Sequence, residues 1–181
     1  MTMTPPAVHG TSSLFGAERA VWRVDPADSR ARFTAATLWG RVQVSGDLGK
    51  VSGELEWHGT SGDARLRIAA AGLSSGLALR DRHLRSREFF DVSRHPEIIF
   101  DAQAIAPERG AVQIAGRLWV RGQGHDFVCE AAATVLEADR ITLETRATFD
   151  LDELGMSRGL LHMLPASVTA QVRVVLQRDR A

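Results

Sequence analysis

From residue 21 onward the chain is dominated by an alternation of apolar and polar residues. In the stretch 112–120, for example, Val, Ile, Gly, Leu and Val occupy every second position, and Gln, Ala, Arg and Trp stand between them. A period of two is typical of a β-strand with one apolar and one polar face, so we expect about seven to nine antiparallel strands joined mostly by short turns. The runs lie near 32–34, 42–48, 51–57, 64–70, 98–104, 112–120, 127–135, 141–149 and 168–176.

Two all-β architectures fit this pattern, a sandwich of two sheets and a closed up-and-down barrel. The size of the inward side chains favours the barrel, because many small residues would leave a sandwich core of about 10 Å underpacked. A barrel of about eight strands can instead enclose a tunnel for one slender ligand. The alternative is that the small residues pack against large aromatic side chains and leave no cavity. The small residues predicted to face inward are Ala64, Ala70, Ala102, Ala104, Gly116, Cys129, Ala131, Ala133, Thr145, Ala147 and Ala170.

Two segments interrupt the strand pattern. Residues 72–92 are rich in arginine and include a short helical stretch after Ser74 and Ser75. This segment is too long for an ordinary connection in a compact β-domain, so we expect a lid over one end of the barrel. Residues 151–165 combine methionine and leucine without a regular period, which suits an adaptable rim.

Composition and charge exclude several classes of function. The 181 residues include 22 basic and 22 acidic side chains, a net charge of zero that disfavours non-specific nucleic-acid binding and attachment to membranes by charge. Residues 1–19 have the composition of a flexible tail without the features of a secretory signal, and residues 20–181 are predicted to form one domain. The longest uncharged stretches are shorter than the roughly 20 residues of a membrane span. We therefore expect a cytoplasmic protein that does not insert into a membrane.

The cysteine and histidine residues give little indication of special chemistry. Cys129 is the single cysteine, which excludes an internal disulfide and favours a reducing compartment. The six histidines show no spacing typical of metal ligands, so no metal site is predicted.

Several motifs, in their order and spacing, resemble the YceI-like family of lipocalin-like, polyisoprenoid-binding proteins. The strongest runs over residues 80–92 as R-D-x-H-L-R-S-x-x-F-F-D-V and continues as H-P-x-I-x-F at 95–100. Shorter matches are W-x-V-D at 22–25 with S-x-x-x-F at 29–33, G-x-L-x-V-R-G at 116–122 and L-G-M at 154–156. The resemblance implies an extended eight-stranded antiparallel barrel whose end is partly covered by a short helical segment.

The same resemblance implies non-covalent binding of an isoprenoid lipid, such as a quinone tail or a polyprenyl chain, for sequestration or transport. No catalytic residue and no required cofactor are predicted. The predicted ligand-binding residues, in the tunnel wall or at its mouth, are Phe33, Leu77, Arg80, Asp81, His83, Leu84, Phe89, Phe90, Phe100, Leu118, Phe127, Ala131, Ala147, Phe149, Met156 and Met163.

The polar residues of the 80–85 motif admit two interpretations. Arg80, Asp81, His83 and Arg85 either contact a polar headgroup at the mouth of the tunnel or form an ion-pair network that pins the lid to the barrel. An enzyme acting on a small lipophilic substrate at this cluster is an alternative function, although the sequence supplies no nucleophile or second acid beside it.

A third class of function is a barrel module that works through protein contacts. Trp39 and Trp119 fall on the less apolar faces of their segments, where a homodimer contact is one interpretation.

Overall fold

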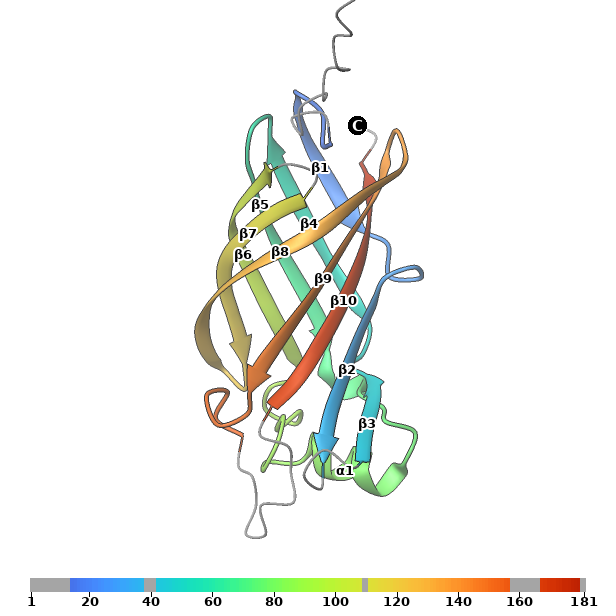
Figure 1. Cartoon of the computed structure of the whole chain (residues 1–181), viewed down its shortest axis with the longest axis vertical. Helices are drawn as coiled ribbons and strands as arrows, with labels where there is room; N and C mark the ends of the chain where they lie inside the picture. Colours follow the sequence, from blue (N-terminus) through green and yellow to red (C-terminus); the bar gives the residue numbers. More distant parts are fainter. Residues whose placement is uncertain (1–13, 38–41, 109–110, 157–166, 180–181) are drawn as a thin grey trace, which may run out of the picture.

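The computed structural model describes residues 14–37, 42–108, 111–156 and 167–179, and Figure 1 shows their arrangement. In these ranges the chain forms one antiparallel sheet that curls into a barrel, with a short helix at one end. The strands are β1 (Arg19–Val24), β2 (Arg30–Thr37), β3 (Val42–Asp47), β4 (Val51–His58), β5 (Gly62–Ala69), β6 (Glu97–Glu108), β7 (Ala111–Val120), β8 (Gln123–Glu137), β9 (Arg140–Asp150) and β10 (Ser167–Arg178), and the helical pieces are the 3-10 helix η2 (Ala70–Gly72) and α1 (Ala78–Arg85).

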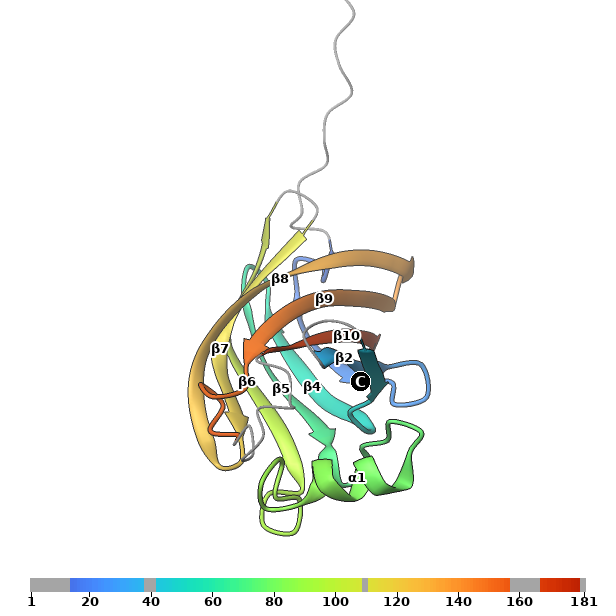
Figure 2. The same ribbon diagram turned by 60° about the horizontal axis from the view of Figure 1, so that its bottom comes forward.

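The barrel closes through β1. The strand order is β1-β4-β5-β6-β7-β8-β9-β10-β2-β3, and β1 also pairs with β10. Eight strands therefore form the closed antiparallel barrel, and the β2–β3 hairpin extends its wall beside β10 (Figure 2). The predicted all-β, eight-stranded lipocalin-like barrel is confirmed, with two additional strands.

β1 and β2 lie end to end along β10 and are separated by a turn. β2 pairs with β10 from Val168 to Arg173, and β1 pairs with it from Leu176 to Arg178. At the break, the backbone amide of Val175 donates to the Ser29 hydroxyl at 2.9 Å, and the amide of Asp25 donates to the Val175 carbonyl at 2.8 Å. The W-x-V-D and Ser29 motif thus holds the interrupted strand to β10, where a buried amide would otherwise lack a partner.

A β-bulge changes the face of one predicted inward residue. The register between β6 and β7 shifts between Ala102 and Ala104. Because one additional residue reverses the alternation, Ala104 is exposed and Ile105 is buried instead. The prediction that Ala104 faces inward is wrong for this reason.

One end of the barrel is filled by aromatic side chains. Phe15 packs on Trp57 with ring centroids 4.8 Å apart and on Trp22 at 5.8 Å, and all three side chains are buried. The Trp57 indole also donates to the carbonyl of Gly16 at 2.8 Å. The structure places Phe15 in the core although the sequence assigns it to the flexible tail. Residues 1–13 lie outside the described ranges.

The other end is covered by the segment around α1, which lies at the bottom of Figure 1 beside β2 and β3. The backbone amide of each of Asp47, on β3, and Ser74 donates a hydrogen bond to the carbonyl of the other, and this antiparallel bridge holds the start of the segment. The neighbouring Leu73 is fully buried. Together, residues 73–96 form what we call the lid. The predicted helical lid segment is present over this end of the barrel.

Candidate functional site

The barrel encloses an apolar cavity of about 260 Å³ that runs from the lid into the middle of the barrel. This volume lies just below the roughly 300–1,000 Å³ that is typical of small-molecule sites, so it suits one slender ligand. Its wall is almost entirely apolar and comes from β1, from every strand between β2 and β10, and from the lid. Of the residues singled out in the sequence, those in the wall are Phe33, Arg80, His83, Leu84, Phe89, Phe90, Phe100, Leu118, Phe127, Ala131, Ala147, Phe149 and Met156.

Two of the residues singled out are not among the lining residues, and a third lies outside the described part of the chain. The Leu77 side chain is 59% exposed on the outside of the lid. Asp81 is buried but bonds within the lid instead of facing the cavity. Met163 lies outside the described residues, as does Trp39.

The structure adds wall residues that were not among the predicted site residues. Leu143, Val168 and Val172 follow from the same alternation and could have been chosen with it. Ile105 could not have been chosen in this way, because the β6 bulge that turns it inward cannot be recognised in the local alternation of apolar and polar residues.

Three phenylalanines form a continuous aromatic surface in the cavity wall. Phe127 lies between Phe100 and Phe149, with ring centroids at 5.7 and 5.2 Å. β7 runs between β6 and β8 there and contributes Gly116, which pairs with Ala102 on one side and Phe127 on the other. A Cβ at Gly116 would lie 2.2 Å from the Asp101 carbonyl oxygen, so only glycine permits this approach of the strands.

The polar groups of the lid are largely engaged with one another. The Asp81 carboxylate accepts hydrogen bonds from the Ser75 hydroxyl and, at 2.7 Å, from the Ser75 amide. These donors, the hydroxyl first, hold the pKa of Asp81 below its usual range, so the group is ionised at neutral pH. Arg85 donates to the Leu73 carbonyl through two nitrogens. Asp81 and Arg85 therefore bind the helix to the chain that precedes it.

Arg80 belongs to this network, His83 pairs separately with Glu88, and both side chains line the mouth of the cavity. Arg80 donates to the hydroxyl and the carbonyl oxygen of Ser75, both at 2.7 Å. The His83 Nε2 lies 3.0 Å from a carboxylate oxygen of Glu88, and its ring packs edge-on against Phe89 at 5.3 Å. Of the polar motif residues, these two have access to a ligand.

A second contact joins the lid to the turn after β9. The Arg121 guanidinium donates to the Gly155 carbonyl and, at 3.0 Å, to the Arg87 carbonyl. Gly155 has a φ of +69°, which favours glycine, and the neighbouring Leu154 and Met156 are buried in the cavity wall. The G-x-L-x-V-R-G and L-G-M motifs thus meet at the rim of the cavity.

A family model described as a YceI-like domain matches residues 22–178. The chain belongs to the YceI-like family. This family consists of binding proteins and not of known enzymes. A comparison with curated proteins gives no match.

Solved structures show the same YceI-like fold at low sequence identity. BcnA of Burkholderia cenocepacia superposes with a TM-score of 0.75 and 18% identity, covering 84% of this chain and 98% of that one. A polyisoprenoid-binding domain from Saccharophagus degradans, described as implicated in plant cell wall breakdown, gives 0.73 and 14%, covering 88% and 99%. The YceI protein of Campylobacter jejuni gives 0.61 and 15%, covering 76% and 86%.

Cys129 is a further polar group in the wall of this YceI-like cavity. Burial raises the pKa of its thiol, although a hydrogen bond with Thr145 acts in the opposite direction. A thiol whose ionisation is suppressed in this way is a weak nucleophile.

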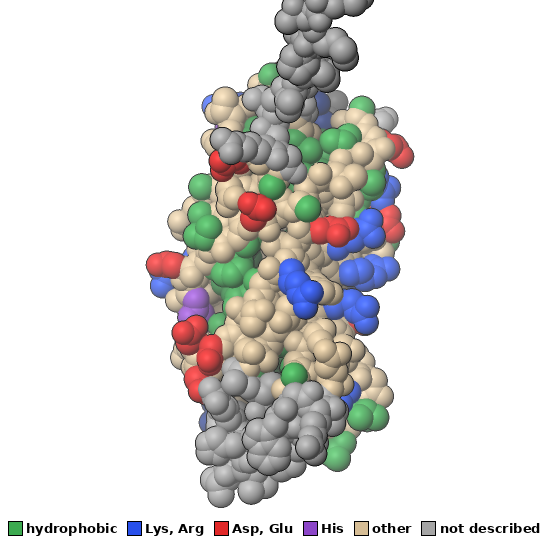
Figure 3. All heavy atoms as spheres, in the orientation of Figure 1, with side chains coloured by type: hydrophobic (Ala, Val, Ile, Leu, Met, Phe, Trp, Pro, Cys, Tyr) green, Lys and Arg blue, Asp and Glu red, His purple; other side chains and the backbone are tan. Residues whose placement is uncertain are grey.

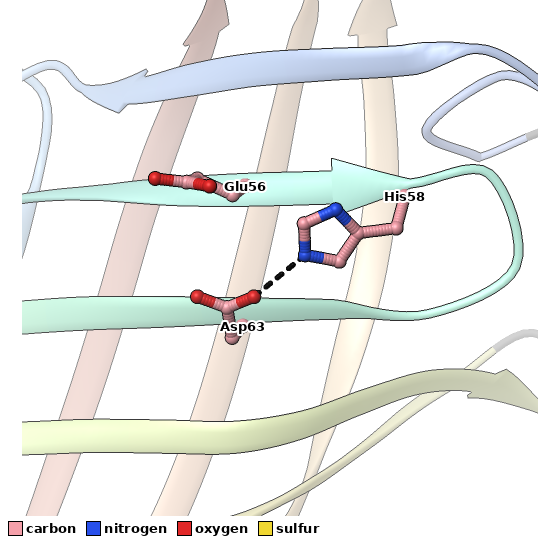
Figure 4. A group of neighbouring side chains, drawn as sticks. All are labelled: Glu56, His58 and Asp63. Carbon is pink, nitrogen blue, oxygen red and sulfur yellow. Dashed lines mark hydrogen bonds and ion pairs between the residues drawn. The ribbon is translucent and has the colours of Figure 1, made fainter.

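One group of potential metal ligands lies on the outside of the barrel (Figure 4). Glu56 and His58 stand two residues apart on β4, and Asp63 is the cross-strand partner of Glu56 on β5. This grouping depends on strand pairing, so the spacing of histidines did not reveal it. The three side chains are exposed, and the His58 Nε2 is hydrogen-bonded to Asp63 at 2.7 Å, which accounts for their proximity without an ion.

Within the described ranges, the helices of this YceI-like chain are too short or too polar to cross a bilayer.

Proposed function

We propose that the protein binds the apolar chain of an isoprenoid lipid in the barrel, for sequestration or transport. The observation that carries the proposal is a narrow apolar cavity with one end filled by aromatic residues and the other covered by a lid. Such a cavity accepts an unbranched or methyl-branched chain from one end only. The similar domain from Saccharophagus degradans, which is described as polyisoprenoid-binding, supports the same ligand class.

The binding energy comes from burial of the chain. Removing hydrocarbon from water stabilises by about 0.8 kcal/mol per CH₂, so each five-carbon isoprene unit contributes a few kcal/mol. Several units offset the cost of ordering the ligand without any strong polar contact. The lining residues named above form the proposed binding site, and no cofactor is needed.

The ligand enters tail first in this proposal, which leaves its polar end at the lid. Arg80 and His83 are the polar side chains available there, and the Arg80 guanidinium can donate to a phosphate or a quinone oxygen. Binding of the headgroup requires Arg80 to exchange part of its bonding to Ser75.

Filling the cavity tests this function. Ala131→Phe and Ala147→Phe place a ring in the cavity, so each should abolish retention of a long apolar guest while changing the free energy of unfolding by less than about 1 kcal/mol. Binding is measured by native mass spectrometry and solvent extraction after incubation with a polyprenol, and stability by urea titration.

Ala132→Phe is the matched control, because Ala132 is the outward-facing neighbour of Ala131 on β8. It should retain the guest. A destabilisation of about 1–3 kcal/mol by both inward substitutions, together with a wild-type protein that remains empty, would show a packed core and overturn the proposal.

A further inference from the structure

The outer surface of the lid presents large apolar side chains to solvent. Leu79 is 80% exposed and Leu77 59% exposed, at the start of α1. Leu79 and Arg82 are three residues apart and therefore share the outer face of the helix, whereas Asp81 is buried on the opposite face. Figure 3 shows hydrophobic side chains protruding at the lower right, over the end of the molecule where α1 lies.

The charges on this surface are predominantly positive. Arg82 lies on the outer face of α1, and Arg87 and Arg94, farther along the lid, are also exposed; none of the three guanidinium groups has a hydrogen bond or ion pair to another described residue. The acidic side chains of the lid are engaged: Asp81 and Asp91 are buried and hydrogen-bonded.

The third lid carboxylate, Glu88, pairs with His83. Asp152 and Glu153 lie at the same end of the barrel, on the turn after β9; both ribbon views place this turn away from α1, although Arg121 joins it to Arg87 of the lid. Within residues 73–96, five arginines therefore outnumber three carboxylates, although the net charge of the whole chain is zero.

This surface adjoins the mouth of the cavity. Arg80 and Leu84, on the inner side of α1, line the cavity, while Leu79 and Arg82 face solvent on the same helix. One short helix thus carries both surfaces: its inner face lines the apolar cavity, and its outer face presents apolar and basic side chains to solvent. An isoprenoid chain resides in a bilayer because water excludes it, so a protein that takes up such a chain gains by opening directly on the bilayer.

We propose that the outer surface of the lid docks on a bilayer that contains anionic lipid and there exchanges the isoprenoid. This inference rests on the proposed lipid binding. Arginine attracts the negative surface, and the two leucines enter the headgroup region, a combination typical of interfacial attachment. Attachment of this kind involves no transmembrane segment.

Flotation with phosphatidylcholine vesicles, with and without phosphatidylglycerol, tests the docking in the full chain. The wild type should float with the anionic vesicles, much less with the neutral ones, and lose binding as salt increases. Leu79→Ser should weaken binding about tenfold or more and Arg82→Ser about fivefold, from the typical contributions of a buried leucine and of one basic residue near an anionic surface.

Leu136→Ser and Arg19→Ser are the matched controls, because both residues are exposed at the opposite end of the barrel. They should float like the wild type. Docking through the lid is overturned if the wild type does not float, if the controls lose as much binding as the lid variants, or if Leu79→Ser instead abolishes a dimer that light scattering detects in the wild type.

Uptake of farnesol without vesicles separates docking from lipid binding. Normal uptake by Leu79→Ser, with vesicle binding lost, supports docking as a separate step. If the wild type floats but takes up no apolar probe, the proposed lipid binding is overturned, and with it the exchange of an isoprenoid at the bilayer. Uptake by a wild type that does not float would overturn docking alone.

Discussion

At the scale of single residues, Cys129 can report on the occupancy of the cavity. Its thiol is the only one in the chain and lies in the cavity wall. Because burial raises its pKa, a smaller fraction is thiolate at pH 8 than for a solvent-exposed cysteine.

We expect Cys129 to react more slowly with N-ethylmaleimide than an exposed cysteine, and more slowly again once an isoprenoid fills the cavity. The reaction should accelerate as the pH rises towards the raised pKa. Mass spectrometry of the alkylated protein measures the rate.

A Cys129→Ser, Val128→Cys double variant provides the control, since Val128 is exposed on the outer face of the same strand. Its alkylation should not respond to the ligand. Equal protection of both cysteines would contradict an internal binding site.

At the scale of elements, helix α1 of the lid depends on a few hydrogen bonds to the lid residues that precede it. The α1 helix has only eight residues, and isolated helices of this length are unstable in water. Asp81 and Arg85 compensate by bonding to Ser75 and Leu73. Removal of one of these polar groups should therefore increase local opening of α1 more than a single polar substitution elsewhere in the molecule would.

Acidification should loosen helix α1 of the lid before the barrel unfolds. The folded-state pKa of Asp81 is lowered, so its stabilising contribution is complete above the unfolded value of about 3.9 and is lost as the pH falls through the lower folded value. Limited digestion with pepsin between pH 2 and about 5 measures lid opening as cleavage within residues 73–96.

Asp81→Asn serves as the reference in this experiment, because it lacks the titrating carboxylate and should be cleaved readily across the whole range. The ratio of the two cleavage rates should approach one at the acidic end. A ratio that does not change with pH would show that Asp81 does not hold the lid.

At the scale of the whole molecule, the two ends of the barrel have different roles. Phe15, Trp22 and Trp57 pack the far end tightly, whereas the lid end combines short contacts with the cavity mouth. In the proposed function, the described part of the chain leaves the lid end as the entrance for the ligand, and structural stability lies at the opposite end.

Phe15→Ala should lower the free energy of unfolding by about 3–5 kcal/mol, the usual cost of deleting a buried phenylalanine, and leave isoprenoid binding intact in the folded protein. Phe90→Ala, at the lid end, should cost less stability, because Phe90 is only partly buried, and should weaken binding. Urea titration and solvent extraction measure the two effects. Loss of binding in a stably folded Phe15→Ala protein would show that the ligand depends on the end of the barrel opposite the lid, which would contradict entry and binding at the lid end.

The alternation in the sequence predicted the strands and most of the cavity wall, and the small inward residues together with the family resemblance favoured a barrel over a sandwich. Alternation is a local property, so Phe100, Phe127 and Ala131 could be assigned to the inner face from their own strands. The lid could also be placed, because residues 72–92 lack the strand period and carry the family motif.

The tertiary structure decided everything that depends on residues distant in the chain. The β6 bulge exchanged Ala104 for Ile105, and the pairing of β1 with β4 brought Phe15 onto Trp57, some forty residues away. Leu77 looked like a cavity residue because it is apolar, but the direction of α1, set by the bonds of Asp81 and Arg85, turned it outward. Hydrophobicity indicates that a side chain seeks an apolar partner, and only the packed fold determines which partner that is.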